Sequence, residues 1–167
     1  QISGDPDWRE LWWTLRALRW QRANDPEYAI VVVLGADRFA HAVTRAAAAI
    51  DDRVVVLPEP VTAATVVSLK VGTVANVGWL QPLLDRLADP QIRAVAPVIL
   101  DERGVIRSAG IWGDNHLLQG FPLEDAVGLD QVAVPGISDV CWATRDGGEH
   151  LGVVAAASVL AHRTRRS

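Results

Sequence analysis

Hydrophobic positions along the chain follow two spacings, which predict alternating helices and strands. Apolar side chains recur every three or four residues over 8–22, 38–50 and 79–88, a spacing that predicts three helices. Short, nearly unbroken apolar runs occupy 29–34, 54–57 and 92–100, and runs of this length are typical of strands buried on both faces. Strand, helix and strand with short loops form a βαβ unit, whose two strands are parallel. We therefore expect an α/β fold, a three-layer sandwich with a mainly parallel sheet.

Several segments are less clearly patterned. The run 61–74 is rich in Thr and Val, which favours a strand, whereas its place between two strands favours a helix. We predict a helix over 62–70 and a strand over 71–75. Residues 1–7 are polar, contain Gly4 and Pro6, and are expected to form a loop. Further short strands are expected at 105–106, 132–136 and 140–144, and the apolar run 151–161 is compatible with either a helix or a strand.

The first predicted helix carries two apolar faces. One stripe is expected to point into the core and contains Trp8, Leu11, Trp12, Leu15 and Leu18. Trp13 and Trp20 lie seven residues apart on a second face, beside three arginines. Either these tryptophans pack against another part of the fold, or the helix lies on a membrane surface or a partner, with self-association as one form of such contact. In the second helix, Phe39, Val43 and Ile50 are expected to point inward.

Composition narrows the class of protein. A chain of 167 residues, half of them apolar and 22% charged, is long enough for one domain with a substantial core. The net charge of −4 argues against nucleic acid as a partner. Cys141 is the only cysteine, which excludes an internal disulfide framework and a cysteine-based zinc cluster. We expect a cytoplasmic protein, with peripheral membrane contact as an alternative. Because the sequence starts at Gln1 and has no Met, we expect a fragment of a longer protein.

Residues 78–110 read GWLQPLLDRLADPQIRAVAPVILDERGVIRSAG. This order of motifs, a "GWL" helix followed by a strand and a hairpin ending in "SAG", resembles the middle of family 2 glycosyltransferases, which have the GT-A fold. The resemblance implies transfer of a sugar from a nucleotide-sugar donor to a glycan or lipid-linked acceptor. It also implies Mg²⁺ or Mn²⁺ on the donor diphosphate, since carboxylate oxygens suit these cations.

The resemblance assigns roles to individual positions. The resemblance implies that Asp37 and Asn76 contact the cofactor or the nucleotide, whereas the residues themselves favour a helix cap for Asp37 and a turn for Asn76. The residues expected at the substrate are Asp114, His116, Asp139 and Trp142, although a surface loop explains Asp114 and His116 equally well and core packing is an alternative for Trp142. Asp146 and Glu149 are expected to supply the catalytic base, and His162 is expected to ligate the metal.

The chain also departs from the family pattern. Val74-Ala75-Asn76-Val77 stands where the family has Asp-x-Asp, and no carboxylate occurs between Glu59 and Asp85. The family's first strand also has no counterpart in the predicted loop 1–7. Without fixed carboxylates, metal-dependent transfer should be slower by a factor on the order of a hundred. The alternative function is therefore a non-catalytic remnant of the fold that binds partners through the Trp-rich helix 8–22.

Overall fold

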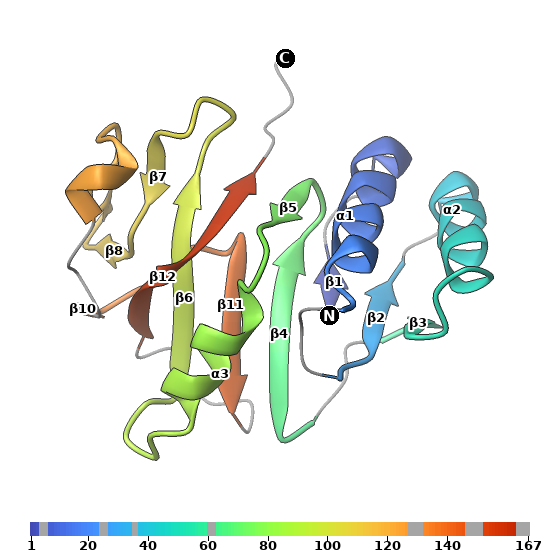
Figure 1. Cartoon of the computed structure of the whole chain (residues 1–167), viewed down its shortest axis with the longest axis horizontal. Coiled ribbons are helices and arrows are strands. Elements are labelled where there is room, and N and C mark those ends of the chain that lie inside the picture. Colours follow the sequence, from blue (N-terminus) through green and yellow to red (C-terminus); the bar gives the residue numbers. More distant parts are fainter. Residues whose placement is uncertain are drawn as a thin grey trace.

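The protein forms one broad β-sheet with three helices packed against it (Figure 1). The computed structural model describes residues 1–3, 7–23, 27–34, 37–59, 63–126, 132–145 and 152–162. The helices are α1 (Trp8–Trp20), α2 (Arg38–Ala48) and α3 (Leu80–Leu87), and a short 3₁₀ turn spans Leu123–Ala126. None of the described helices is long and apolar enough to cross a membrane.

The strands of the large sheet run in the order β10-β12-β6-β11-β4-β1-β2-β3, with β5 added to β12 and β7 added to β6. The strands on one side are β1 (Ile2–Ser3), β2 (Ile30–Val33), β3 (Val54–Leu57) and β4 (Thr65–Lys70). Those on the other are β5 (Thr73–Ala75), β6 (Ala94–Leu100), β7 (Ile106–Ser108), β10 (Val132–Val134), β11 (Cys141–Arg145) and β12 (Gly152–His162). A separate hairpin pairs β8 (Ile111–Trp112) with β9 (Asn115–His116).

The expected mainly parallel sheet is wrong. Within the described part of the large sheet, five strand pairs are antiparallel and four are parallel. Strands β3, β2, β1 and β4 form a parallel group. The βαβ pattern predicted only the pair of β2 and β3 within it. Antiparallel β11 then lies between β4 and β6, so the sheet is mixed. Buried apolar runs predict that a segment is a strand. They do not predict whether it runs parallel or antiparallel to its neighbours, because that depends on the path of the connecting segments.

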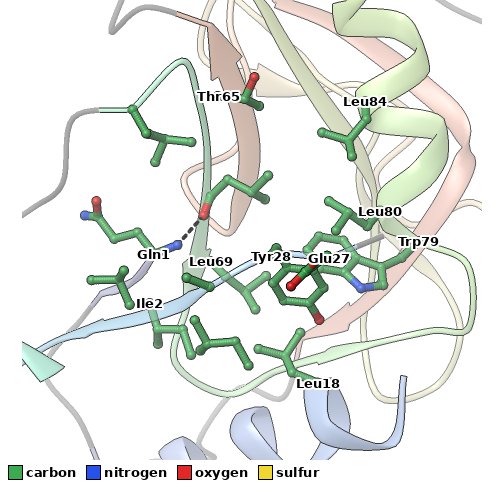
Figure 2. Close-up of a pocket in the computed structure, with 16 residues that line it drawn as sticks. Gln1, Ile2, Leu18, Glu27, Tyr28, Thr65, Leu69, Trp79, Leu80 and Leu84 are labelled. Carbon is green, nitrogen blue, oxygen red and sulfur yellow. Dashed lines mark hydrogen bonds between the residues drawn. The ribbon is translucent and has the colours of Figure 1, made fainter. Parts of the chain in front are cut away.

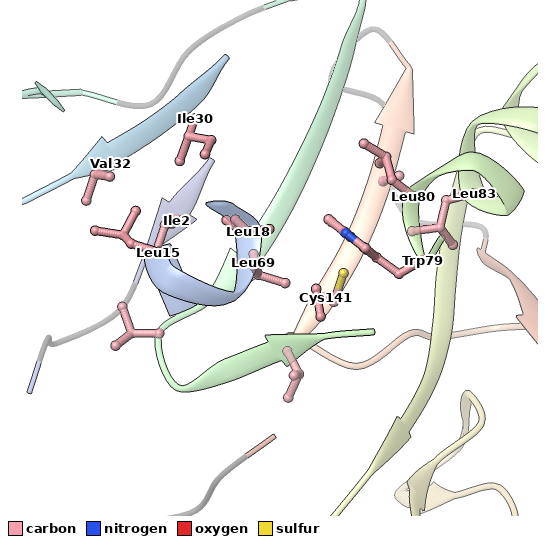
Figure 3. Packing of buried hydrophobic residues seen from close by; sticks show 14 of the residues in the cluster. Ile2, Leu15, Leu18, Ile30, Val32, Leu69, Trp79, Leu80, Leu83 and Cys141 are labelled. Carbon is pink, nitrogen blue, oxygen red and sulfur yellow. The ribbon is translucent and has the colours of Figure 1, made fainter. Parts of the chain in front are cut away.

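The expected three layers are also wrong for the described residues, because all three helices contribute to one core on one face of the sheet. Figure 3 shows Leu15 and Leu18 of α1 and Leu80 and Leu83 of α3 in the same cluster as strand residues Ile30, Val32 and Leu69. Ala40 and Ala47 of α2 belong to this cluster as well. Alternate residues of β6, Val98 and Leu100, point to the other face, where they pack against Ile106 and Val134.

Two segments have a different structure from the one expected. Residues 65–70, predicted to be helical, form strand β4, paired with β11 on one side and β1 on the other. Its β-branched residues Thr65, Val66 and Val67 suit a strand once both neighbours are present. Ile2 and Ser3, predicted to lie in a loop, form β1 in the middle of the sheet, opposite Leu69 and Lys70. The ambiguous run near the end of the chain is strand β12.

The helices begin where the sequence predicts, but their faces differ in part. Asp7 caps α1 and Asp37 caps α2. In α2 the buried residues are Ala40, Thr44 and Ala47, whereas Phe39 is 56% exposed. Ile50, beyond the helix, is also exposed, so the prediction that both point inward is wrong. Small side chains face inward here because α2 packs closely against both α1 and β3.

Candidate functional site

The order of the strands reverses between β1 and β4. From β1 the chain continues through α1 to β2 on one side, whereas β4 lies on the other side of β1 and leads toward α3 and β6. In open α/β sheets, ligands bind outside the carboxyl ends of parallel strands at such a point, because the two connections diverge there. Ser3 and Lys70 lie opposite each other at the carboxyl ends of these two strands. They mark the candidate site.

Lys70 forms an ion pair with Asp139 at this edge. The Nζ atom of Lys70 donates to Oδ2 of Asp139 at 2.8 Å, across 69 positions of sequence. The Lys70 side chain is 42% exposed and the Asp139 side chain 78% exposed, so both reach solvent. The hydrogen bond from Lys70 lowers the pKa of Asp139, and the charge of Arg107 lowers it further. The Asp139 carboxylate therefore lies in the field of two cations, Lys70 at hydrogen-bonding distance and Arg107 farther away.

The backbone around Lys70 is fixed by the strands beside it. The backbone N–H of Lys70 donates to the carbonyl of Val140 at 2.8 Å, and its carbonyl accepts from the Thr73 hydroxyl at 2.6 Å. Thr73 is fully buried. The turn that carries Lys70 is thus anchored on both sides, while the ammonium group remains accessible.

The predicted cofactor residues have structural roles in the described part of the chain. The Asp37 carboxylate accepts from the backbone N–H groups of Phe39 and Ala40 at 2.7 and 3.3 Å, which is the helix-cap alternative. Asn76 is exposed and follows β5, and its carbonyl accepts from the N–H of Trp79 at 3.3 Å, as in a turn. Among the contacts of the described residues, neither the Asp37 nor the Asn76 side chain bonds to Lys70 or Asp139.

The predicted acceptor residues Asp114 and His116 lie on the β8–β9 hairpin. Nδ1 of His116 lies 2.9 Å from the Ser108 hydroxyl, which is buried and also contacts the backbone of Gly110. Asp114 is exposed at the turn of the hairpin. A bridge between Ile111 and Gly136 holds this hairpin against the segment that leads to Asp139.

Gly136 suits this close approach, because a Cβ added there would lie 3.3 Å from Cβ of Ile111, which is tighter than most such contacts. The structure thus places the β8–β9 hairpin beside the segment that leads to Asp139. Trp142 is half-buried in β11 opposite Ser68. Its neighbour Ala143 belongs to the core beneath the helices, so Trp142 points to the other face.

The predicted catalytic residues Asp146 and Glu149 lie outside the described residues. His162 is the last residue of β12, where its backbone lies opposite Thr73, but its side chain also lies outside the described part. Across the described residues, no group of three His, Cys, Asp or Glu side chains is placed to hold a metal ion. Among the described carboxylates, Asp139 pairs with Lys70 and Asp37 caps α2.

Sequence analysis missed Lys70 as a site residue. It is the only lysine in the chain and ends an apolar strand, but that strand was predicted to be a helix, which hid its position at the sheet edge. The signal that was available is a single charged residue at the end of the segment 65–70, whose first three residues are β-branched. No family model matches the sequence, and no curated protein is significantly similar to it.

Proposed function

We propose that this chain is a nucleotide-sugar-binding domain of the glycosyltransferase type, which binds the donor at the carboxyl edge of β1 and β4. The observation that carries the proposal is the Lys70–Asp139 pair at the point where the strand order changes direction. The resemblance of residues 78–110 to family 2 glycosyltransferases gives the ligand class. Sugar transfer to a glycan or lipid-linked acceptor is the activity that follows from that class.

The charges at this edge suit a diphosphate. The Lys70 ammonium pairs directly with the Asp139 carboxylate, so a phosphate that replaces this carboxylate meets that cation, with the positive charge of Arg107 acting at longer range. A charged hydrogen bond of this kind contributes about 1.5–3 kcal/mol. Because the Asp139 side chain is mostly exposed, it can turn into solvent at little cost when a phosphate takes its place.

The β8–β9 hairpin offers a surface for the acceptor. Trp112 is 63% exposed beside Asp114 and Asn115, a combination of an aromatic face and polar groups that suits a sugar ring. His116, held by the buried Ser108 hydroxyl, keeps the hairpin in a defined orientation. Donor and acceptor would then meet near the segment that joins the hairpin to Asp139.

The test is calorimetric titration of uridine- and guanosine-diphosphate sugars into the wild-type chain and into Lys70→Gln. Loss of the ammonium should weaken binding about tenfold or more. Arg93→Gln is the matched control, because Arg93 is exposed just before β6, at the opposite edge of the sheet. That variant should bind like the wild type. Failure of the wild type to bind any nucleotide-sugar at millimolar concentration, or equal binding by Lys70→Gln, would refute the proposal.

A second function, an interaction module, is favoured by the exposed tryptophans of α1. Trp13 and Trp20 are 45% and 70% exposed, and the Arg16 guanidinium lies between them, 5.3 and 4.7 Å from the ring centroids. The exposed Ile50 lies beside this surface, across a groove of about 280 Å³ between α1 and the end of α2. Aromatic rings paired with arginine are typical of interaction surfaces.

Light scattering and co-sedimentation with anionic lipid vesicles test this second function. If the wild type self-associates or binds vesicles, the double variant Trp13→Ser/Trp20→Ser should lose that behaviour. Trp112→Ser removes an equally exposed tryptophan from the distant hairpin and should retain the behaviour. A wild type that is monomeric and stays in the supernatant would exclude both forms of contact.

A further inference from the structure

The outward face of α1 carries arginine and tryptophan in alternation. Arg9, Trp13, Arg16 and Trp20 are all exposed, and their spacing of four, three and four residues places them on one line along the helix. This line is roughly 16 Å long, because an α-helix rises about 1.5 Å per residue. We call these four residues the outer stripe.

The opposite face of α1 is buried against the sheet. Leu11, Leu15 and Leu18 lie in the core cluster. Figure 2 shows Leu18 pointing from α1 toward the cavity that it lines together with Tyr28. Because these leucines already hold α1 on the sheet, the tryptophans of the outer stripe are not needed for the core and remain in contact with solvent.

The arginines of α1 stack on its tryptophan rings. The Arg16 guanidinium lies 5.3 Å from the centroid of the Trp13 ring and 4.7 Å from that of Trp20, and the Arg9 guanidinium lies 4.4 Å from that of Trp8. Contacts of a cation with an aromatic face strengthen when water is removed from them. The outer stripe therefore presents rings and cations at one level, in an arrangement that gains strength in a less aqueous layer.

Two exposed arginines of α1 lack a carboxylate to neutralise them. Arg9 lies 4.0 Å from Asp7, but no carboxylate among the described residues pairs with Arg16 or with Arg19, which lies beside the stripe one turn further on. The chain as a whole has a net charge of −4, so this helix face is a positive patch on an acidic protein. A patch of this kind attracts a negatively charged surface and orients the protein on it.

We propose that the outer stripe binds the surface of an anionic lipid bilayer, with α1 parallel to that surface. This inference rests on the interaction-module function and names its partner. The guanidinium groups of Arg16 and Arg19 bond to lipid phosphates in this arrangement. The rings of Trp13 and Trp20 lie at the level of the headgroups, where an indole keeps its N–H in a polar layer while the ring contacts the acyl chains.

A second copy of the chain fits this face less well. If two outer stripes met across a two-fold axis, arginine would lie against arginine, and like charges in contact repel. A stable protein interface also takes about 20–30 residues from each side, whereas the outer stripe is a single row of side chains on a convex helix. A bilayer accepts such a row, because each anchor enters the headgroup layer separately.

The test is co-sedimentation with vesicles of phosphatidylcholine containing about one-third phosphatidylglycerol, which is anionic, and with vesicles of phosphatidylcholine alone. The wild type should bind the anionic vesicles at least about tenfold more tightly. Arg16→Gln/Arg19→Gln should lose at least about tenfold in affinity, since each arginine near an anionic surface contributes about fivefold. Arg93→Gln/Arg103→Gln is the matched control, because it changes the net charge equally at exposed positions before and after β6. The control should bind like the wild type.

Salt and unfolding measurements separate this mechanism from damage to the fold. Raising the salt concentration from about 0.1 to about 1 M should weaken wild-type binding several-fold, because salt screens exposed charges. Arg16 and Arg19 are exposed, so their replacement should leave the urea midpoint of unfolding unchanged. A loss of vesicle binding at an unchanged midpoint then reports the contact itself.

Equal binding to neutral and anionic vesicles, or wild-type binding by Arg16→Gln/Arg19→Gln, would overturn the proposal. A wild type that stays in the supernatant with both kinds of vesicle would overturn it as well. Light scattering then decides the wider function. Self-association without vesicle binding overturns the lipid surface and leaves the interaction module in place, whereas a monomer that binds no vesicles excludes both.

Discussion

Asp51 is the residue whose replacement most directly tests how the parallel part of the sheet is held to α1. Its side chain is 3% exposed and lies in the turn between α2 and β3. Nη2 and Nε of Arg53 donate to its two carboxylate oxygens at 2.8 and 3.0 Å. The same Nη2 also donates to the carbonyl of Leu18 in α1 at 3.1 Å, and the guanidinium lies 4.8 Å from the centre of the Tyr28 ring. The ion pair thus links three segments.

Replacing Asp51 with Asn removes the charge and keeps the shape. Arg53, whose side chain is only 10% exposed, then remains a nearly buried cation without its carboxylate. Breaking a buried pair from one side costs about 3–5 kcal/mol, and the oxygen retained by Asn places the effect near 3 kcal/mol. For a chain of this length, that corresponds to a fall in Tm of roughly 6–12 °C.

Asp52→Asn is the matched control. Asp52 pairs with Arg22 at 2.9 Å, but its side chain is 78% exposed, so its loss should cost less than about 1 kcal/mol. The assay is urea unfolding of the wild type and both variants at pH 7, 5 and 3. A difference between the two variants of less than about 1 kcal/mol at pH 7 would refute the reasoning.

The pH series gives a second check. Hydrogen bonds from Arg53 lower the pKa of Asp51 in the folded state, against the opposing effect of burial. A carboxyl whose folded pKa is lowered stabilises the protein at pH values above its unfolded pKa of about 3.9, and this contribution is lost as pH falls through the folded pKa. The gap between wild type and Asp51→Asn should therefore narrow at pH 3. A gap that stays constant would mean that the charge is not its cause.

Three further predictions concern other residues. Burial raises the pKa of the Cys141 thiol, so a thiol reagent at pH 8 should label the chain only in urea; rapid labelling of the folded protein would contradict the buried position. Thr14→Val removes the buried hydroxyl that accepts from the N–H of Gly72 at 3.0 Å, which should cost about 1–3 kcal/mol in urea unfolding, and a neutral result would argue against that bond. If Asp146 or Glu149 supplies the catalytic base, the corresponding Asn or Gln variant should slow donor hydrolysis about a hundredfold or more while nucleotide binding is retained; unchanged rates in both variants would exclude them.

The sequence alone predicts those features that depend on neighbours along the chain. The three helices begin at or within one residue of their predicted starts, because a cap such as Asp37 and an apolar spacing of three and four act within a few residues. The apolar runs that became β2, β3 and β6 were also recognised as strands from local sequence, although Val55 of β3 is exposed rather than buried as expected. The helix cap formed by Asp37 could also be predicted locally, because it depends only on Asp37 and the backbone of the next three residues.

Tertiary structure decided the features that depend on distant partners. Residues 65–70 became a strand because β11 and β1 supply hydrogen bonds on both sides, and no local pattern reports those partners. The direction of β11 made the sheet mixed, and the packing of small residues Ala40 and Ala47 turned Phe39 outward. The candidate site depends on Lys70 and Asp139, two charges 69 residues apart. Only the pairing of β4 with β11 brings them to one edge, because sequence fixes which side chains are charged but not which strands meet.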